Sequence, residues 1–282
     1  MVREPLELDE RSRLKTATAR SFAYEWQQFG HLRPEWRRNF LDYIQPYAPT
    51  DLAGCVLLDA GAGSGRHSHQ AAEFGARVVA VELGEAVDVA RANLPSNVLT
   101  VQADVEDLPL AADAFDFVLS IGVLHHLPKT EQALAGLARH ARPGGVVHVY
   151  LYWVPERRLH RALLAAVTAA RRVTTRLPLR VVHALSYPIA AVAYAACVLP
   201  YRTLRRFGPT RRLARGLPLK AYADYPFGVC VNDQYDRFSA PLERRFTAED
   251  VEAMMRAAGL EKVRVLPNNG WVVTGRRPLQ AA

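Results

Sequence analysis

The stretch VLLDAGAGSGRHS, residues 56–68, constrains the fold more than any other part of the sequence. A run of valine and leucine leads into Asp59 and then into a loop with glycine at every second position, Gly61, Gly63 and Gly65. A buried strand, a glycine-rich turn and a helix start form the first unit of many nucleotide-binding α/β sheets. The sequence therefore predicts a strand, a turn and a helix here, with a nucleotide-like ligand at the turn.

The residues around this stretch alternate between short apolar runs and alanine-rich segments. The apolar runs, which we expect to be buried strands, lie at 55–59, 77–82, 98–102, 115–121 and 145–152. The alanine-rich segments, which we expect to be helices, lie at 64–75, 85–93 and 129–141. Strands that alternate with helices form βαβ units. The pattern predicts a parallel sheet in an α/β domain.

The C-terminal region ends this alternation with a helix and two strands. In FTAEDVEAMMRAAGL, Thr247 is an N-cap with Asp250 three residues later, and Gly259 ends the helix. Asn-Gly at 269–270 then separates KVRVL from WVVTG. Asn-Gly between two strand-like runs is a strong hairpin signal, so we expect the sheet to end in an antiparallel pair.

The N-terminal region is polar at first and then rich in aromatic residues. Residues 1–19 predict a loose or helical leader, and 20–47 predict two short helices on either side of a break from Gly30 to Pro34. The first residues are charged throughout, which excludes a secretory signal. Three scattered cysteines without a C-x-x-C pair favour a reducing compartment and neither a disulfide framework nor a zinc site. We therefore expect a cytoplasmic protein.

The residues around the glycine loop discriminate between nucleotides. A dinucleotide fingerprint needs its third glycine at position 66, where this chain has Arg66. The first two strands end in Asp59 and Glu82, and the segment after the third strand supplies Asp104. Three carboxylates along one edge would repel a pyrophosphate and suit a positively charged nucleoside without phosphate. A nicotinamide dehydrogenase is therefore the weakest interpretation of the loop.

Four motifs in a fixed order give the chain a family resemblance. They are VLLDAGAGSG with Glu82 downstream, QADVEDLPL, FDFVLSIGVLHHL and RPGGVVHVYLY. Together they resemble the motifs of class I S-adenosylmethionine-dependent methyltransferases, in particular the type 11 branch that includes ubiquinone and menaquinone methyltransferases. The resemblance covers residues 50–153, and the terminal helix and hairpin fit the family's sixth and seventh strands. It implies a Rossmann-like α/β fold, with a seven-stranded, mostly parallel sheet, helices on both faces and an antiparallel terminal hairpin.

The resemblance also implies S-adenosyl-L-methionine as cofactor and S-adenosyl-L-homocysteine as product. The loop glycines would pass close under the methionine part, with Asp59 orienting the loop or the ammonium group. Glu82 would accept both ribose hydroxyls, and Asp104 would accept the adenine amino group beside the backbone N–H of Val105. No metal is implied. The implied cofactor residues are Asp59, Ala60, Gly61, Gly63, Gly65, Glu82, Leu83, Asp104, Val105, Ser120 and Gly122.

Each carboxylate also has an interpretation that involves no cofactor. Asp59 would then cap the following helix, Glu82 would be an exposed strand end, and Asp104 would be a turn residue in ADVEDLP. Their joint position at three strand ends favours the cofactor interpretation.

Methyl transfer from a sulfonium is an in-line displacement, so positioning and water exclusion supply much of the catalysis. A hydroxyl or protonated amine acceptor also needs a base, for which His125 and His126 after the fourth strand are the candidates. Helix-start hydrogen bonding is the alternative role of both histidines. The N-terminal aromatic residues either cover the cofactor as part of a lid or only pack on the sheet. The candidate substrate and lid residues are Phe22, Tyr24, Trp26, Tyr152, Tyr235 and Asp236.

The segment 154–226 interrupts the α/β pattern with a strongly basic insertion after the fifth strand. Between 157 and 220 it holds thirteen arginines, Lys220 and no acid, a local charge of +14 in a chain of net charge +8, which leaves −6 for the remainder. Four of these arginines, at 157, 161, 172 and 176, can share one face of the first helix of the insertion. Such a helix either lies in a membrane interface or covers an apolar pocket. Residues 184–201 carry no charge and reach the lower limit of a membrane span, with Pro188 predicted to interrupt the helix.

The sequence therefore predicts four parts: N-terminal helices or lid at 1–50, a cofactor-binding core at 51–153, a basic helical cap at 154–226 and the rest of the core at 227–282. We expect a small-molecule O-, N- or C-methyltransferase whose partly apolar acceptor lies between the strand tips and the cap. The alternatives are a non-methylating enzyme that uses the same cofactor, a membrane-peripheral lipid or quinone methyltransferase, and a non-enzymatic binding protein. Peripheral membrane contact would occur through 157–220. The insertion has few aromatics and no recognised nucleic-acid module, so we expect no nucleic-acid partner.

Overall fold

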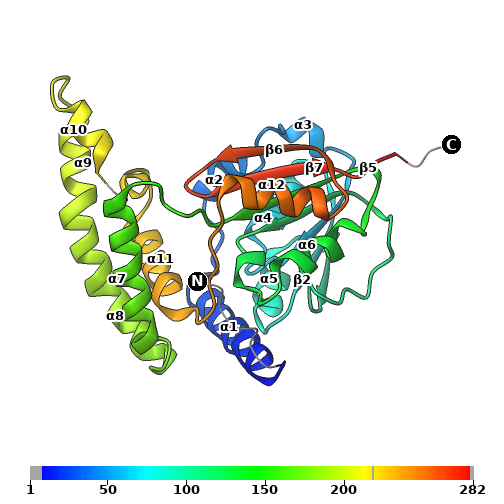
Figure 1. Ribbon diagram of the computed structural model, residues 1–282, viewed down its shortest axis with the longest axis horizontal. Coiled ribbons are helices and arrows are strands. Elements are labelled where there is room, and N and C mark those ends of the chain that lie inside the picture. The colour runs from blue at the N-terminus through cyan, green and yellow to red at the C-terminus, as the bar shows by residue number, and fades with distance from the viewer. Residues whose placement is uncertain (1–7, 218, 280–282) are drawn as a thin grey trace. The chain divides into compact units, whose positions relative to one another are not determined.

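Seven strands form one sheet in the order β3-β2-β1-β4-β5-β7-β6 (Figure 1). The first five run parallel to their neighbours, and β7 pairs antiparallel with both β5 and β6. Their bounds are β1 (Val56–Ala60), β2 (Arg77–Glu82), β3 (Leu99–Gln102), β4 (Phe115–Ile121), β5 (Ala141–Leu151), β6 (Glu261–Pro267) and β7 (Trp271–Arg276). The predicted fold, with its parallel sheet and antiparallel terminal pair, is confirmed.

The computed structural model describes residues 8–217 and 219–279, which divide into two compact units. The first unit comprises the sheet and its helices, within 1–161 and 242–282, and the second comprises 162–241. Residues 1–7, Pro218 and 280–282, which the expected ranges include, lie outside the described part. The second unit includes α11 (Phe227–Ser239), which packs against α8 (Leu179–Ala193).

Helices cover both faces of the sheet in the first unit because neighbouring strand residues point to opposite sides. Leu58 and Val118 join one buried cluster with α6 (Thr130–Ala138) and α12 (Ala248–Ala257). Leu57 and Leu119 join a second cluster on the other face. The helices in that second cluster are α2 (Glu35–Tyr43), α3 (Pro49–Leu52) and α4 (Arg66–Glu73). Both faces of a parallel sheet are buried in this way, which explains the continuous apolar runs of the sequence.

Two predicted elements differ in extent from the structure. The first N-terminal helix, α1 (Leu8–Phe29), is not short, because the polar leader contains good helix formers and continues the same helix. Strand β5 begins at Ala141, four residues earlier than expected, since Ala141 pairs with Phe115 before a bulge interrupts the register. Gly144 lies in this bulge at φ +76°, a backbone conformation that favours glycine.

Strand order reverses between β1 and β4, so their carboxyl ends flank a topological switch point. The connection from β1 leads through α4 to β2 and then through α5 (Ala86–Asn93) to β3, whereas β4 and β5 lie on the other side of β1. Ligands of open α/β sheets bind outside the carboxyl ends of the strands at such a point. The fold therefore places the glycine loop after β1 where a nucleotide-like ligand is expected.

The C-terminal helix and hairpin form as the sequence predicts. Thr247 caps α12 by accepting a hydrogen bond from the Asp250 N–H at 3.2 Å, and the Thr247 N–H donates to Asp250 in return at 2.8 Å. Gly259 follows the helix at φ +77°. Asn269 lies at φ +52° in the turn between β6 and β7, which connects the paired residues Pro267 and Trp271.

The second unit is helical. Its elements are the greater part of α7 (Arg158–Thr174), then α8, a π-helical turn (Tyr194–Val198), α9 (Leu199–Leu204), α10 (Arg211–Gly216), a 3₁₀ turn (Lys220–Asp224) and α11. Pro188 lies inside α8 and does not interrupt it, contrary to the prediction. Alanine, leucine and valine around it maintain the helix, because a proline removes only one hydrogen bond and the neighbouring turns remain intact.

One helical segment in the described part of the chain, Leu179–Leu204, is long and apolar enough to cross a membrane as judged by length and composition. It has 26 residues and a mean hydropathy of 1.7 over its most apolar window, of which 22% is buried. A core helix of this composition would be mostly buried. This segment instead presents most of its apolar surface outward.

Candidate cofactor site and active site

The turn between β1 and α4 brings the backbone of the glycine loop into close contact with its surroundings. Gly61 has φ +90° and Gly63 has φ +56°. A Cβ atom on Gly61 would lie 2.3 Å from a methyl group of Val123, and one on Gly63 would lie 2.7 Å from Nε1 of Trp26. Any side chain at these two positions would therefore be strained in conformation and would also clash.

Asp59 ties the end of β1 to the first turn of α4. Its side chain is 1% exposed, and its Oδ2 accepts a hydrogen bond from the Ser68 hydroxyl at 2.6 Å. Burial raises the pKa of Asp59 to about 6, although the Ser68 hydrogen bond acts in the opposite direction. This carboxylate does not act as the N-cap of α4, which is Gly65.

Glu82 at the end of β2 holds the loop from the other side. Its Oε2 accepts from the Gly63 N–H at 2.9 Å, and its Oε1 accepts from the N–H groups of Leu83 at 2.9 Å and Gly84 at 3.3 Å. Burial raises the pKa of Glu82, and the three backbone hydrogen bonds oppose that rise. The carboxylate is thus fixed in orientation against the glycine loop and is not an exposed strand end.

Asp104, in the segment after β3, is paired with a residue that the sequence analysis did not single out. Lys15 of α1 forms ion pairs with both Asp104 and Glu106. Burial lowers the pKa of Lys15, but the hydrogen bonds and charges of the two acids outweigh burial and leave the pKa raised. Lys15 lies seven residues before Phe22 and eleven before Trp26, a spacing that places all three on one helix face and could have revealed it.

Helix α1 lies along the carboxyl ends of β1, β2 and β3. Besides Lys15 at Asp104 and Trp26 at Gly63, Ala19 and Ala23 approach Gly84, where an added Cβ would lie 3.5 Å from each. The end of α1 is fixed by Asn93, whose side-chain amide donates to the carbonyls of Gly30 at 2.6 Å and Ser64 at 2.8 Å. The aromatic residues Phe22, Tyr24 and Trp26 therefore lie on one helix, α1, which runs along the predicted cofactor edge.

Arg66 occupies the place of the missing third glycine and is held between two indole rings. Its guanidinium carbon lies 4.9 Å from the ring centres of both Trp26 and Trp36. Cation–π contacts of this kind direct the charge toward the aromatic faces. The guanidinium of Arg66 therefore contacts Trp26 and Trp36, and this arrangement fits a ligand that has no pyrophosphate for the arginine to bind.

The ends of β4 and β5 carry a row of aromatic and imidazole rings. His125 stacks on Tyr152 with ring centres 3.8 Å apart, His126 lies 4.3 Å from His125, and Phe22 of α1 meets His126 edge-on at 4.8 Å. Tyr150, also on β5, contacts Tyr43 at 4.7 Å. These rings and the glycine loop belong to the same edge of the sheet.

Both histidines belong to a 3₁₀ turn (Leu124–His126) after β4, and both are buried. Nδ1 of His126 lies 2.6 Å from the carbonyl oxygen of Leu242. Because a carbonyl can only accept, Nδ1 of His126 carries the proton, and Nε2 is the basic nitrogen of the neutral ring. The backbone carbonyl of His125 accepts from the Arg244 N–H at 2.9 Å, so the turn is fixed to the segment that returns before α12.

The remaining predicted residues lie as follows. Ser120 is fully buried and donates to the carbonyl of Ala60 at 2.9 Å, and Gly122 follows at φ +80°. Val105, after β3, is buried in the same apolar cluster as Leu58 and Val81, and Tyr24 is partly buried on α1. Tyr235 and Asp236 lie on α11 in the second unit, where Tyr235 is fully buried.

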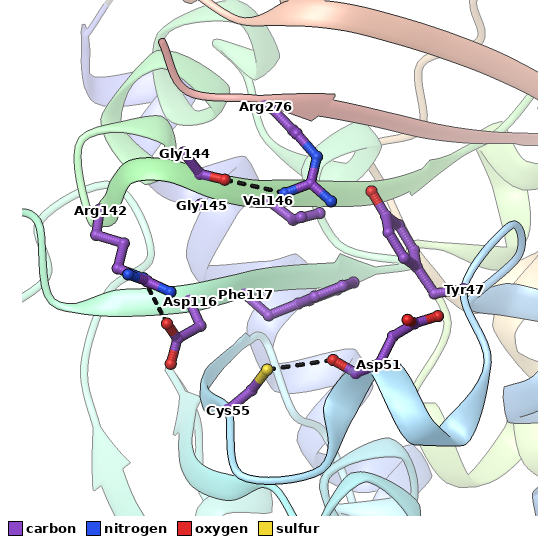
Figure 2. A pocket seen from close by; sticks show the side chains of 10 residues that line it. All are labelled: Tyr47, Asp51, Cys55, Asp116, Phe117, Arg142, Gly144, Gly145, Val146 and Arg276. Carbon is purple, nitrogen blue, oxygen red and sulfur yellow. Dashed lines mark hydrogen bonds and ion pairs between the residues drawn. The ribbon is translucent and has the colours of Figure 1, made fainter. Parts of the chain in front are cut away.

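A pocket opens at the opposite edge of the sheet, at the amino ends of β1 and β4 (Figure 2). Its polar groups pair with one another: Arg142 binds Asp116 at 2.5 Å, and Arg276 donates to the carbonyl of Gly144 at 3.0 Å. No residue predicted for the cofactor or acceptor lines it. The lining residues are Tyr47, Asp51, Cys55, Asp116, Phe117, Arg142, Gly144, Gly145, Val146 and Arg276.

The order of the seven strands, the glycine loop after β1 and the acid that ends β2 are the features by which the chain resembles the class I S-adenosylmethionine-dependent methyltransferases. Residues 58–149 match the family model of a methyltransferase domain, Methyltransf_11. This stretch of the chain therefore resembles a type 11 methyltransferase domain, and the cofactor that this resemblance implies is S-adenosylmethionine. The carboxylates at the strand ends and the indole-bound Arg66 fit this phosphate-free, cationic cofactor.

Curated relatives with similar sequences include two ubiquinone biosynthesis O-methyltransferases. The protein from Nitrosococcus oceani is 31% identical over 160 residues, which cover 54% of this chain and 65% of the relative. The protein from Hahella chejuensis is 34% identical over 143 residues, which cover 49% of this chain and 58% of the relative. In each case the match spans less than two thirds of the relative's own length.

Solved structures share the fold at low sequence identity. A 1,6-didemethyltoxoflavin-N1-methyltransferase from Burkholderia thailandensis, solved with its substrate and S-adenosylhomocysteine, has a TM-score of 0.52 and 17% identity, and covers 98% of this chain and 93% of that one. An O-methyltransferase family protein from the same organism also has a TM-score of 0.52, at 13% identity, and covers 97% of this chain and 62% of that one. These likenesses establish the fold.

Proposed function

We propose that the protein transfers a methyl group from S-adenosylmethionine to a small, partly apolar acceptor that binds beside the ends of β4 and β5. The observation that carries the proposal is the row of rings formed by Phe22, His126, His125 and Tyr152. Rings of this kind bind a flat or apolar molecule by burial and stacking. The bound cofactor supplies a methyl group on a positively charged sulfur.

The chain's own residues would hold the cofactor through charge and backbone. Glu82 accepts from three backbone N–H groups, two at Oε1 and one at Oε2, which leaves acceptor capacity on Oε2 for a ribose hydroxyl. Asp104 would accept a hydrogen bond from the adenine amino group after its ion pair with Lys15 opens. Asp59 would hold the loop and contribute negative charge near the methionine end. Ala60, Leu83, Val105, Ser120 and Gly122 would line the same site.

Acceptor chemistry would depend on the two histidines. A hydroxyl acceptor must lose its proton, and Nε2 of His126 is the basic nitrogen when Nδ1 donates to Leu242. His125, stacked on Tyr152, would position the acceptor ring. Trp26 and Phe22 on α1 would cover the site and exclude water, with Tyr24 beside them.

The names of the relatives favour an acceptor of quinone type, and so a lipid-soluble one. Two of the curated proteins that match this chain are ubiquinone biosynthesis O-methyltransferases. We propose that the protein methylates such an acceptor as a cytoplasmic or membrane-peripheral enzyme. A non-methylating reaction with the same cofactor is the alternative that product analysis would reveal.

The test is a binding and product experiment. Calorimetry should show uptake of S-adenosylhomocysteine and none of a nicotinamide dinucleotide, and incubation with hydroxylated aromatic acceptors should add one methyl group as measured by mass spectrometry. The Glu82→Gln variant should bind S-adenosylhomocysteine at least about tenfold more weakly, whereas Glu73→Gln, an exposed glutamate on α4, should bind normally. Tight binding of the dinucleotide without binding of S-adenosylhomocysteine would overturn the proposal.

A further inference from the structure

The second unit, residues 162–241, is both strongly basic and apolar on its surface. It contains eleven arginines and Lys220 against three aspartates, a net charge of +9. Most of the exposed large apolar side chains of the described chain also belong to it. They are Leu163, Val173, Val181, Leu185, Tyr187, Val192, Leu199, Phe207, Leu213 and Phe227.

Helix α8 and its continuation through α9 carry the longest apolar stripe. Val181, Leu185, Val192 and Leu199 recur at helical spacing and are 42%, 41%, 69% and 48% exposed. The small residues between them on the same face are exposed as well, and no charged residue occurs from 181 to 201. At about 1.5 Å per residue, the stripe from Val181 to Leu199 is roughly 27 Å long.

Arginines border this stripe at both ends. Arg180 precedes it and is exposed, while exposed Arg206, Arg211 and Arg212 follow it. In the second of these groups the arginines alternate with the exposed apolar residues Phe207 and Leu213. An apolar helix face with cationic flanks is complementary to the acyl boundary and the anionic headgroups of a bilayer.

The opposite face of α8 shows how the helix would meet a membrane. Val182, Ser186 and Ala190 are buried, and α8 packs against α11. Helix α11 buries Asn232 and Gln234 and carries charged residues besides. A bilayer-spanning α8 would draw these polar side chains into hydrocarbon, which is costly. A helix that lies in the plane of the interface keeps α11 on the aqueous side.

We propose that the stripe on α8 and α9, with Arg180, Arg206, Arg211 and Arg212 at its ends, docks the protein on the surface of an anionic lipid bilayer. The apolar side chains enter the acyl boundary, and the arginines bind lipid phosphates. This inference goes beyond methyl transfer and stands independently of it, because none of these residues is assigned to the cofactor or the acceptor.

The experiment is co-sedimentation of the full chain with vesicles. Binding is expected to vesicles of phosphatidylglycerol and phosphatidylcholine in low salt, and it should weaken as salt rises toward about 0.5 M. Vesicles of phosphatidylcholine alone should bind far less. Absence of binding to the anionic vesicles at low salt would overturn the proposal.

Two sets of variants separate the apolar and the cationic contributions. Leu185→Ser with Val192→Ser should reduce the vesicle partition coefficient by at least about tenfold at every salt concentration. Arg180→Gln, Arg206→Gln and Arg212→Gln together should reduce it by about fivefold per arginine at low salt. All five positions are exposed, so the variants should fold, and unchanged binding of S-adenosylhomocysteine would verify this.

The matched control removes the same charge from the first unit. Arg38→Gln, Arg77→Gln and Arg264→Gln alter three exposed arginines there and should leave vesicle binding unchanged. An equal loss in this control would mean non-specific charge attraction and overturn the proposal. Resistance to extraction by alkaline carbonate would indicate a membrane span and would also overturn the proposal. A dimer that dissociates only in the Leu185→Ser, Val192→Ser variant would overturn it as well, because a second copy of the chain would then cover the stripe. If the unaltered protein does not bind S-adenosylhomocysteine, the proposed function is refuted but the membrane proposal is not.

Discussion

Replacing Asp59 with asparagine should make the first unit more stable and should weaken its affinity for the cofactor. Asp59 is almost completely buried, and burial raises its pKa from 3.8 to about 6. The folded protein therefore binds this proton more tightly than the unfolded chain does. Ionisation of Asp59 therefore lowers the free energy of unfolding. This loss is absent below about pH 3.8, grows as the pH rises and is complete above about pH 6.

The magnitude follows from the pKa. A rise of about two pH units, at 1.36 kcal/mol for each, means that ionised Asp59 lowers the free energy of unfolding by about 3 kcal/mol at pH 8. The side-chain amide of the Asp59→Asn variant keeps an oxygen that accepts from Ser68 and never ionises. The free energy of unfolding of this variant should therefore exceed that of the unaltered protein by about 3 kcal/mol at pH 8. At pH 4 the two free energies should differ little. Its affinity for S-adenosylhomocysteine should fall by roughly tenfold, since the negative charge near the ligand's ammonium group is lost.

Urea unfolding followed by tryptophan fluorescence measures this difference. All four tryptophans, Trp26, Trp36, Trp153 and Trp271, belong to the first unit, so the signal reports on that unit. Ser68→Ala is the matched control: it removes the hydrogen bond that lowers the pKa of Asp59, and it should make the dependence on pH steeper. A stability difference between Asp59→Asn and the unaltered protein that is the same at pH 4.5 and pH 8 would refute the reasoning.

Three further predictions concern α1 and α12. Lys15→Gln should raise the affinity for S-adenosylhomocysteine several-fold in calorimetry, because Asp104 no longer has to leave an ion pair to accept the adenine amino group; equal affinities would exclude this competition. Trp26→Ala should weaken the same ligand by about tenfold if α1 is a lid, and unchanged binding and turnover would leave only a packing role. Thr247→Ala should cost about 1 kcal/mol in urea unfolding through loss of the N-cap, and an effect below a few tenths would show that Asp250 suffices alone.

The core of the fold was predictable because its strands are buried on both faces. Continuous apolar runs such as FDFVLSI form β4, and alanine-rich segments form the helices between strands. The caps of α12 and the Asn-Gly turn depend on local backbone chemistry, which a short stretch of sequence contains completely. For the same reason the positive φ angles of Gly61 and Gly63 agree with the predicted turn.

Features that depend on distant contacts were not predictable. Lys15 was overlooked because its partners, Asp104 and Glu106, lie some ninety residues away in the sequence. The continuity of α8 through Pro188 depends on the stability of the turns around it, which outweighs the local effect of one proline. The implied cofactor followed from four short motifs, each contained in one segment of the sequence. The rings at the ends of β4 and β5, by contrast, come together only through α1 and the sheet.

The position of β7 between β5 and β6 has a consequence for biosynthesis. Residues 146–151 of β5 pair with 271–276 of β7, so this edge of β5 has no partner until residues 271–276 have left the ribosome. During that interval the nascent protein exposes an apolar strand edge that other chains can join. We expect truncation before Trp271 to produce aggregates rather than a smaller soluble domain, and dependence on chaperones to end when β7 is inserted.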